Sequence, residues 1–258
     1  MIFSKYEGAG NDFILIDNRS LSFDPSLVSQ LCDRKYGIGA DGVILLQLDP
    51  AADLRMRIFN SDGSEAESCG NGLRCLVQFA RDLNLSPQRI AMHDRIVEAF
   101  SSDGRIGIRL GEPRNLCLNL PLAFDNSTHT VHLVNTGVPH VVLFVSDLSS
   151  IDVATLGRKI RHHPAFSPHG VNVNFASLLP DRSFSVRTYE RGVEAETLAC
   201  GTGAAAVGVI GSQIYALPSP VRIQFAGGDM DIVFSDKNFF DLSLIGPARR
   251  VFSGTYCG

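Results

Sequence analysis

One passage of this sequence occurs twice, and the repetition limits the folds open to the chain. Residues 59–72 and residues 189–203 each run from an aromatic residue through a polar pair, a glycine turn and Glu-Ala-Glu to Cys-Gly-x-Gly. The two cysteines, Cys69 and Cys200, lie 131 positions apart, which is about half of the 258-residue chain. A repeat at this spacing predicts two similar halves, and the length alone favours roughly 1.7 domains of ordinary size.

The segments before the two passages also follow one order. In the first half, an apolar run typical of a strand covers 13–17, and a helix is predicted over 24–37, from an Asp-Pro cap to a glycine. In the second half, the strand covers 141–145 and a helix over 152–163 begins at an Asp cap. Each half therefore goes from strand to helix to further strands, and then to the repeated passage.

A second helix is predicted directly after each Cys-Gly-x-Gly. The first ends before Pro87 and is apolar on one face. The second ends before Pro218, and because residues 204–210 are apolar nearly all round, we expect it to be buried. Further strands are predicted at 96–100, 105–110, 131–134, 171–178, 183–189, 221–225 and 230–234. Many strands with few, central helices predict an α/β protein of the α+β type, with two pseudo-symmetric halves of mainly antiparallel sheet joined near residues 111–114.

A cysteine at the start of a helix has a defined chemistry. Backbone N–H groups and the positive end of the helix dipole face it, which lowers the pKa of the thiol toward neutral values. The neighbouring glycines let a ligand approach the backbone, and the same N–H groups can hold an anion such as a carboxylate. One such site indicates a nucleophile or a redox thiol, whereas two equivalent sites indicate a reaction with two faces.

Racemisation of a carbon acid is a reaction of that kind. A base removes the α-proton on one face and an acid returns a proton on the other, so thiolate and thiol exchange roles when the reaction reverses. Because the α-proton of an amino acid is weakly acidic, the charge that develops on the α-carboxylate must be stabilised. Each donor aimed at that charge contributes about 2.7–4 kcal/mol in the transition state. Neighbouring groups must keep one thiol charged and the other neutral, and the two thiols titrate as a pair.

Several passages, in order and spanning nearly the whole chain, carry a family resemblance. They are residues 8–13, 37–42, 57–65, 69–75, 139–140, 189–192 and 199–203. The sequence resembles the diaminopimelate epimerases, which interconvert LL- and meso-diaminopimelate without a cofactor on the route to lysine and peptidoglycan. The resemblance implies an isomerase that needs neither pyridoxal phosphate nor a metal, and whose substrate is a small molecule, diaminopimelate.

The resemblance also implies roles for individual residues. Cys69 and Cys200 would be the catalytic acid/base thiols, with His140 and Glu190 beside them to set their protonation. The backbone N–H groups offered to the reacting carboxylate would come from Gly70, Asn71, Gly201 and Thr202. Substrate-binding positions are matched by Asn11, Asn60, Asn172, Glu190 and Arg191, with Arg191 on the distal carboxylate.

A fold is implied as well. Each half would be a sheet wrapped around a central helix, with the active site in the cleft between the halves. The last strand would return to the first half, so the N-terminal half would comprise 1–113 with 248–258 and carry Cys69. The C-terminal half would comprise 114–247 and carry Cys200.

Three places depart from the family pattern. Val138 stands where well-described members have an asparagine that contacts the distal end of the substrate, Gly42 replaces a glutamine of some members, and the turn over 191–197 is one residue longer. The chemistry is intact, whereas recognition of the distal end differs. A racemase of broader specificity, which also acts on a shorter dicarboxylic amino acid such as glutamate, is therefore an alternative.

Other classes stay open on the residues alone. A thiol–disulfide redox protein would use Cys69 and Cys200 as a working dithiol, and a non-catalytic binding module would hold the substrate without exchanging its α-proton. A proline racemase also uses two thiols, but Asn11, Asn60 and Arg191 favour a longer dicarboxylate. The other cysteines are interpreted as inert buried thiols at Cys32, Cys75 and Cys117 and an exposed one at Cys257.

Two further patterns are weak. Residues 37–42 match the dinucleotide-binding pattern, but a helix precedes them and a strand follows, so a tight turn is the better interpretation. His162 and His163 lack the spacing of a zinc site, and the sequence contains no Cys-x-x-Cys or His-Glu-x-x-His. The sequence therefore predicts neither a metal ion nor a nucleotide cofactor.

Composition and charge disfavour several classes of partner. With 45% hydrophobic and 19% charged residues, the chain is typical of a globular protein. A net charge of −4 without a Lys/Arg cluster disfavours nucleic acid. No apolar run approaches the ~18 residues that a membrane helix needs, and the N-terminus lacks the features of a signal peptide. We expect a cytoplasmic protein with reduced thiols and no membrane partner; a homodimer is left open.

Overall fold

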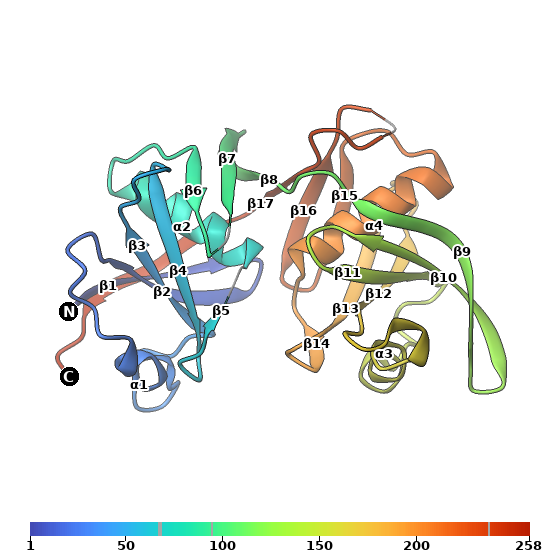
Figure 1. The fold of residues 1–258 in the computed structure, drawn as a ribbon, viewed down its shortest axis with the longest axis horizontal. Coiled ribbons are helices and arrows are strands. Elements are labelled where there is room, and N and C mark those ends of the chain that lie inside the picture. Colours follow the sequence, from blue (N-terminus) through green and yellow to red (C-terminus); the bar gives the residue numbers. More distant parts are fainter. Residues whose placement is uncertain (67–68, 94, 237) are drawn as a thin grey trace. The chain divides into compact units, whose positions relative to one another are not determined.

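The computed structural model describes residues 1–66, 69–93, 95–236 and 238–258. The chain separates into two compact units: unit 1 comprises 1–108 with 246–258, and unit 2 comprises 109–245. Figure 1 shows both as arrays of strands with a helix among them. The C-terminal segment, red in Figure 1, lies beside the blue N-terminal strand of unit 1.

The sheet of unit 1 joins strands from the two ends of the sequence. It contains β1 (Ile2–Gly8), β2 (Asn11–Asp17), β3 (Gly42–Gln47), β4 (Leu54–Asn60), β5 (Glu65–Ala66), β6 (Arg89–Ala91), β7 (Ile96–Ser102), β8 (Arg105–Arg109) and β18 (Arg249–Thr255). Its order is β18–β1–β2–β3–β4–β6–β7, and β8 pairs with β7. The pairs β2–β3 and β4–β6 are parallel and the others antiparallel. The short β5 forms a hairpin with β4.

The sheet of unit 2 repeats this plan. It contains β9 (Arg114–Phe124), β10 (Ser127–Asn135), β11 (Pro139–Phe144), β12 (Asn172–Leu178), β13 (Phe184–Glu190), β14 (Ala195–Thr197), β15 (Val221–Phe225), β16 (Gly228–Val233) and β17 (Ser243–Gly246). Its order is β9–β10–β11–β12–β13–β15–β16–β17, with β11–β12 and β13–β15 parallel. The short β14 forms a hairpin with β13, as β5 does with β4. The repeated passage in the sequence therefore reflects one strand-pairing plan used twice.

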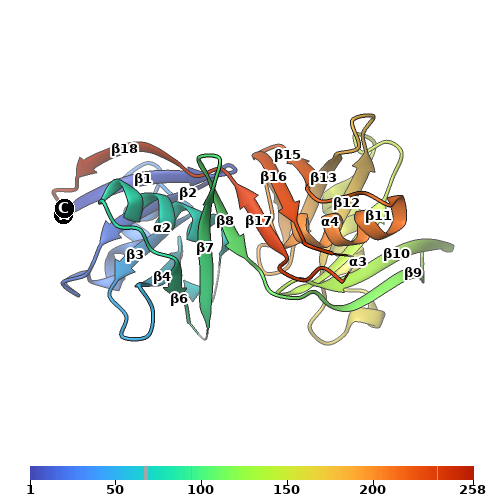
Figure 2. The same cartoon turned by 90° about the horizontal axis from the view of Figure 1, so that it is seen from above.

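A helix lies against the sheet of each unit. In unit 1, α2 (Gly70–Asp82) contacts β1, β2, β3, β4 and β18, and in unit 2, α4 (Gly201–Tyr215) contacts β10, β11, β12, β13, β15 and β16. Figure 2 shows both helices among the strands of their own unit. Every residue of α4 from Gly203 to Gly211 is buried, which confirms the prediction from its all-round apolar sequence. The predicted fold class, a mainly antiparallel sheet around a central helix in each half, is confirmed.

The two predicted Asp caps behave differently. α3 (Val153–Arg161) begins at Asp152, whose carboxylate accepts the Thr155 N–H at 3.1 Å, as predicted. Asp24 accepts the Ser26 N–H at 2.9 Å, but it caps only the 3-10 turn η1 (Pro25–Leu27). A second 3-10 turn, η2 (Pro164–Phe166), follows α3. Both predicted caps are confirmed, but the element that directly follows Asp24 is a 3-10 turn and not the predicted α-helix.

The helix predicted up to Gly37 is wrong in its end point, because α1 (Val28–Cys32) ends at Cys32. The N–H groups of Ile38 and Gly39 donate to the Leu31 carbonyl at 2.9 and 3.0 Å, so the chain folds back onto the end of the helix. A Cβ atom at Gly37 would lie 2.1 Å from a backbone carbonyl oxygen of that helix. Gly37 thus permits a close return of the backbone after the helix has ended.

The sequence pattern did not reveal β9. This strand pairs with β10, and of its eleven residues only Leu122 is buried. Asn115 and Asn119 have positive φ angles of 54° and 56°, and Pro121 lies within the strand. A strand with little burial, an irregular backbone and a proline carries no alternating hydrophobic signal and fits the edge of a sheet. Cys117 lies on it and is exposed, so the expectation of a buried thiol there is wrong.

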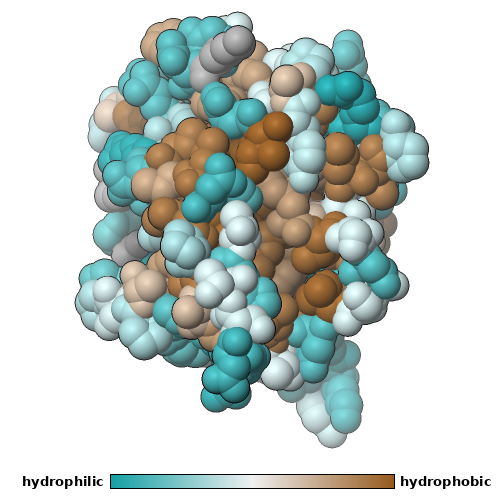
Figure 3. Space-filling model, turned by 90° about the vertical axis from the view of Figure 1, so that its right-hand side faces the viewer, coloured by the Kyte–Doolittle hydropathy of each residue, from teal (hydrophilic) through white to brown (hydrophobic). Residues whose placement is uncertain are grey.

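Apolar side chains gather on part of the surface. Figure 3 shows them in brown over the middle of one face, bordered by hydrophilic side chains. The large apolar side chains exposed in unit 2 include Leu116, Leu178, Val193, Leu198, Ile214 and Phe240. Within the described ranges, no helix combines the length and the apolar character that crossing a bilayer requires.

Close packing of α4 against the sheet makes a testable prediction at Gly208. A Cβ atom there would lie 2.9 Å from the side chain of Ile232, which is fully buried. Alanine normally stabilises a helix by about 1 kcal/mol relative to glycine, but overpacking costs about 1–3 kcal/mol. We expect Gly208→Ala to lower the free energy of unfolding, measured by urea denaturation. An increase would show that the sheet yields at this contact.

Candidate active site

Cys69 and Cys200 both occupy the residue before the first turn of a helix. Cys69 has extended backbone angles (φ −152°, ψ 114°), and its sulfur accepts the Gly72 N–H at 3.3 Å. Cys200 has nearly the same angles (φ −129°, ψ 114°), and its sulfur accepts the Gly203 N–H at 3.4 Å. Each sulfur thus takes the capping role that a serine or aspartate oxygen usually fills. The prediction that the two cysteines begin equivalent helices is confirmed.

The glycines that follow each cysteine differ in purpose. A Cβ atom at Gly70 would meet nothing within 4 Å, so the backbone at the start of α2 is open to a ligand. A Cβ atom at Gly72 would lie 2.9 Å from Ile44, and one at Gly203 would lie 2.4 Å from the Asn174 amide oxygen. The second glycine of each motif is therefore required by packing. Gly70 and Asn71 lie in the first turn of α2, as Gly201 and Thr202 do in α4, where backbone N–H groups point out of the end of the helix.

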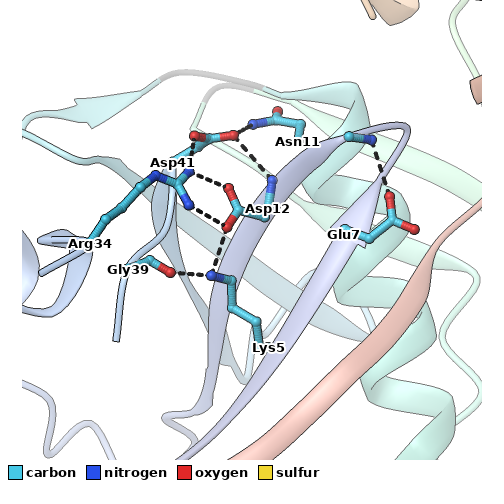
Figure 4. A network of polar contacts seen from close by, with 8 residues as sticks. Lys5, Glu7, Asn11, Asp12, Arg34, Gly39 and Asp41 are labelled. Carbon is cyan, nitrogen blue, oxygen red and sulfur yellow. Dashed lines mark hydrogen bonds and ion pairs between the residues drawn. The ribbon is translucent and has the colours of Figure 1, made fainter. Parts of the chain in front are cut away.

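In unit 1, Asn11 lies beside Cys69 with its orientation fixed. The amide nitrogen of Asn11 donates to the Asp41 carboxylate at 2.6 Å (Figure 4). Because a carboxylate only accepts, the amide oxygen must be the atom that faces Cys69, at 3.7 Å from its sulfur. Asn11 therefore accepts a hydrogen bond from Cys69 when that residue is a thiol.

An ion-pair network supports this arrangement. Arg34 lies 2.7 Å from both Asp12 and Asp41, and Lys5 lies 2.7 Å from Asp12 (Figure 4). Lys5 also donates to the Gly39 carbonyl. Burial alone would raise the pKa of Asp12, but hydrogen bonds from Arg34 and Lys5 hold that pKa well below its usual value. Residues 37–42 are recognisable in the sequence as a turn and as part of the family pattern, but neither pattern predicts that Asp41 and Arg34 hold a site residue.

Arg74 is a buried cation beneath the start of α2. Its side chain is fully buried and donates to the Asn71 amide oxygen at 2.9 Å, to the Gly70 carbonyl at 3.4 Å and to the Pro247 carbonyl at 3.0 Å. Burial lowers the pKa of Arg74, while the sulfurs of Cys75 and Cys69 are close enough to favour its charged form. Arg74 therefore orients Asn71 and places positive charge near Cys69. This role could not be predicted from the sequence, since an arginine on a helix is usually solvated.

Asn60 is less closely tied to Cys69. It ends β4, is exposed, and its amide donates to the Ser64 hydroxyl at 3.0 Å. The structure therefore places Asn60 in the turn before the repeated Glu-Ala-Glu, while Asn11, Gly70 and Asn71 lie directly at the start of α2 or against its cysteine.

In unit 2, His140 and Thr202 lie beside Cys200. The Nε2 atom of His140 is 2.9 Å from the Thr202 hydroxyl oxygen, which lies 3.6 Å from the Cys200 sulfur. His140 is fully buried on β11. Burial, with a smaller contribution from the charge of Arg191, lowers the pKa of His140 to about 3. His140 is therefore a neutral imidazole across the physiological range.

The environment of Cys200 overturns one expectation. Burial and the charge of Glu190 raise the pKa of Cys200 well above its usual value, although the Thr202 hydroxyl and the Gly203 N–H act in the opposite direction. Burial also raises the pKa of Glu190, which is hydrogen-bonded by Cys200 and by the Thr197 hydroxyl at 2.7 Å. A helix start alone predicts a lowered thiol pKa, and at Cys200 that prediction is wrong, because desolvation and a neighbouring carboxylate outweigh it.

Asn172 and Arg191 are neighbours across the ends of two paired strands. The buried amide of Asn172 accepts the backbone N–H of Arg191 at 2.8 Å. In the turn after Arg191, Glu194 has a positive φ of 58° and lies 3.1 Å from Arg161 of α3. This ion pair fastens the turn to α3.

The two other departures also have local explanations. A Cβ atom at Gly42 would lie 2.4 Å from the Phe59 carbonyl oxygen, so this strand pair demands glycine. Val138 is half-buried in a turn in which its carbonyl accepts the Thr136 N–H at 3.3 Å. The Thr136 hydroxyl donates to the Thr202 carbonyl at 2.7 Å, which holds that turn against the start of α4.

The remaining candidates for chemistry lie elsewhere. Cys32 and Cys75 are buried, and burial raises the pKa of both thiols, that of Cys32 to about 11. Cys257 is exposed. His162 lies 3.4 Å from Glu194 on the surface. In the described part of the chain, no three His, Cys, Asp or Glu side chains gather as metal ligands would.

The comparison with known proteins agrees with this arrangement. A family model described as diaminopimelate epimerase matches residues 3–96 and 132–251. The chain belongs to the diaminopimelate epimerase family. The matched segments include both repeated passages and the segment that carries His140.

Relatives of similar length are found in several bacteria. A diaminopimelate epimerase of Flavobacterium psychrophilum is 40% identical over 258 residues, which cover 97% of this chain and 98% of that protein. One of Nostoc punctiforme is 41% identical over 278 residues, covering 98% of each.

Solved structures show the same fold at low sequence identity. A phenazine biosynthesis protein of the PhzF family from Bacillus anthracis covers 99% of both chains, with a TM-score of 0.74 and 15% identity. A hydroxyproline epimerase from Agrobacterium vitis covers 98% of this chain and 90% of its own, with a TM-score of 0.67 and 15% identity. Identities this low support the fold and say nothing of the substrate.

The lowered pKa of His140 predicts a pH dependence of stability. The unfolded state binds a proton at this residue below about pH 6.5, whereas the folded state does so only near pH 3. The contribution of His140 to the free energy of unfolding is therefore fully present above about pH 6.5. Below that pH it falls by about 1.4 kcal/mol per pH unit. Urea unfolding between about pH 6.5 and pH 5 should show the wild type losing about 2 kcal/mol more than His140→Gln. Parallel losses in the two proteins would contradict a neutral buried imidazole.

Proposed function

We propose that this chain interconverts LL- and meso-diaminopimelate by a two-base reaction, in which one thiolate removes the α-proton and the other thiol donates its own proton to the opposite face. The observation that carries the proposal is the duplicated sulfur cap, in which Cys69 and Cys200 each begin a helix and accept the N–H of the third residue on. A reaction with one acid and one base on opposite faces of a carbon needs two equivalent groups. Membership of the family supports diaminopimelate as the substrate.

In the proposed step, one thiolate takes the α-proton and the other thiol gives its proton to the opposite face. The electron pair of the broken C–H bond is held on the α-carbon and its carboxylate, and then forms the new C–H bond. The product leaves with thiol and thiolate exchanged. The proposal requires Cys69 and Cys200 to reach one α-carbon from opposite sides.

The first turns of α2 and α4 would bind the α-carboxylate. Gly70, Asn71, Gly201 and Thr202 lie in these first turns, where backbone N–H groups point out of the helix end and the helix dipoles favour negative charge. Donors placed at developing charge contribute about 2.7–4 kcal/mol each to the transition state. Arg191 would bind the distal carboxylate, with Asn172 fixing its backbone.

The surroundings of the two sulfurs support one starting state. The raised pKa of Cys200 favours a thiol there, with Glu190 beside it. The buried guanidinium of Arg74 lies near Cys69 and favours negative charge on that sulfur. We infer that Cys69 is the base and Cys200 the acid at the start of the turnover, and that both roles exchange in the reverse direction.

Both cysteines should be indispensable. We expect Cys69→Ala and Cys200→Ala each to lower the rate of diaminopimelate epimerisation by about a thousandfold or more, since general acid–base catalysis contributes about 10²–10⁴ per group. The measurement is conversion of LL- to meso-diaminopimelate by chiral chromatography, with circular dichroism to verify folding. Cys117→Ala on the exposed β9 is the matched control and should retain activity.

Two outcomes would decide against the proposal. Full activity in either catalytic variant would show that the thiols do not move the proton. A thiol–disulfide protein would instead cycle its dithiol with a partner while wild-type protein incorporates no deuterium at the α-carbon of diaminopimelate in deuterated water.

The turn that carries Val138 makes a prediction about substrate range. Because valine offers no hydrogen bond where other members have asparagine, we expect Val138→Asn to lower the KM for diaminopimelate about fivefold. The wild type should also exchange the α-proton of glutamate for deuterium at a measurable rate. Wild-type protein that epimerises diaminopimelate and leaves glutamate unlabelled would rule out the broader specificity.

The cellular location and the oligomeric state are addressed by the sequence alone. We propose that the enzyme acts in the cytoplasm on its small-molecule substrate and without nucleic acid, which the net charge of −4 supports. Sedimentation of the purified protein would decide between monomer and homodimer.

A further inference from the structure

A buried asparagine lies behind His140 and has no role in the assignments above. We propose that Asn174 is a positioning residue that holds His140 in a single tautomer and so turns the Thr202 hydroxyl toward the Cys200 sulfur. This inference rests on the proposed function, in which Cys200 carries a proton to and from the substrate. All of the residues in the argument belong to unit 2.

The orientation of the Asn174 amide is fixed on both sides. Asn174 is fully buried on β12. Its nitrogen lies 3.0 Å from the Val141 carbonyl oxygen, which can only accept, and its oxygen accepts the Thr188 hydroxyl at 2.9 Å. Exchanging the nitrogen and the oxygen would place two acceptors against each other. The second hydrogen of the amide nitrogen therefore points at the Nδ1 atom of His140, 3.1 Å away.

That contact determines the proton position on His140. An atom that faces an N–H donor must accept, so Nδ1 carries no proton. In the neutral imidazole the proton then lies on Nε2, which is 2.9 Å from the Thr202 hydroxyl oxygen. Nε2 donates and the Thr202 oxygen accepts.

The hydroxyl hydrogen of Thr202 is thereby free for Cys200. The Thr202 oxygen lies 3.6 Å from the sulfur, within reach of a hydrogen bond to it. The single hydrogen of the Cys200 thiol goes to the Glu190 carboxylate, which is the stronger acceptor. Hydrogen bonds thus run in one direction from Asn174 through His140, Thr202 and Cys200 to Glu190.

The direction of this chain matters when Cys200 has lost its proton. A thiolate accepts hydrogen bonds only, and the Thr202 hydroxyl and the Gly203 N–H are its donors. In the other tautomer of His140, Nε2 would be an acceptor and would take the hydroxyl hydrogen away from the sulfur. The anionic state of Cys200 would then lose one of its two donors, beside a carboxylate that already disfavours it.

Charged groups around His140 support a neutral ring. Arg191 acts on it with positive charge, and the burial of the ring disfavours a second proton. The Asn174 amide adds an N–H donor at Nδ1, where a second proton would have to bind. Asn174 also packs closely against Gly203. A Cβ atom at Gly203 would lie 2.4 Å from the amide oxygen of Asn174, so the asparagine is in direct contact with the start of α4.

The first test is direct. The nitrogen chemical shifts of ¹⁵N-labelled imidazole separate protonated from unprotonated nitrogens, and His140 is assigned by loss of its signals in His140→Gln. We expect wild-type protein to show Nε2 protonated and Nδ1 unprotonated across the neutral pH range. A proton on Nδ1, on its own or together with one on Nε2, would overturn the proposal without any variant.

The second test separates positioning from structure. Asn174→Leu keeps a similar volume and removes the donor to His140, whereas Thr188→Val removes the other hydrogen bond of the same amide and leaves that donor in place. We expect Asn174→Leu to populate the second tautomer, to lower kcat about tenfold to a hundredfold with KM little changed, and to move Cys200 ionisation to higher pH by about one unit. Thr188→Val should retain the tautomer, the titration and kcat.

Cys200 ionisation is followed by the ultraviolet absorbance of its thiolate. The signal is the difference between each protein and the same protein with Cys200→Ala, which cancels the other cysteines. Thr202→Val removes the hydroxyl and keeps its backbone N–H, so it should shift the Cys200 titration as Asn174→Leu does while leaving the His140 proton on Nε2.

The outcomes distinguish this inference from the proposed function. Equal effects of Asn174→Leu and Thr188→Val on tautomer and titration would reduce Asn174 to a structural residue and overturn the inference. An unchanged tautomer in folded Asn174→Leu would do the same. If the tautomer and the Cys200 titration respond as expected while wild-type protein does not epimerise diaminopimelate, the positioning role stands and the proposed function fails.

Discussion

The hydrogen bond from a backbone N–H to a cysteine sulfur, made once at the start of each central helix, is the interaction on which this structure depends. A helix begins with N–H groups that need acceptors, and here the acceptor is also the group proposed to carry the proton. Each sulfur must therefore lie at the N-terminal end of its helix, and each helix must pack against a sheet that covers it. The capping distances of 3.3 and 3.4 Å show that both units meet this condition in the same way.

The two units use opposite charges around this common geometry. The buried guanidinium of Arg74 lies near Cys69, and the carboxylate of Glu190 lies near Cys200. A symmetric pair of thiols would have no preferred site for the single negative charge that the proposed reaction needs. The differing side chains supply the preference, while the shared backbone supplies the common geometry. Duplication of the strand plan and divergence of the buried charges are thus separate features of the chain.

The fold could be predicted from the sequence as far as its signals were local or repeated. The doubled passage indicated two halves and both sulfur-capped helices, and the all-round apolar run after Cys200 indicated a buried helix. The end of α1 and the strand β9 could not be predicted. Backbone returning onto Leu31 is a tertiary contact, and an exposed strand has no hydrophobic period.

The site could be predicted only in part, for a related reason. Asn11, Cys69, His140 and Thr202 lie in motifs, and the structure places each of them at or beside the start of its central helix. The roles of Asp41 and Asn174 arise from neighbours distant in sequence, and that of Arg74 arises from its complete burial, so spacing does not reveal them. The raised pKa of Cys200 depends on how deeply the fold buries it, which a motif does not record.

The pairing of β18 with β1 has a consequence for biosynthesis. Residues 249–255 complete the sheet of unit 1 by bonding to residues 2–8, and the backbone of Tyr256 also donates to the Met1 carbonyl. A ribosome makes the chain from its N-terminus, so the edge of β1 that pairs with β18 stays open until residues 249–255 have been translated. Unit 2, from 109 to 245, leaves the exit tunnel with its own strands already present. The synthesis of unit 1 thus begins before that of unit 2 and is completed after it. Unpaired strand edges of this kind are sites where nascent chains associate incorrectly.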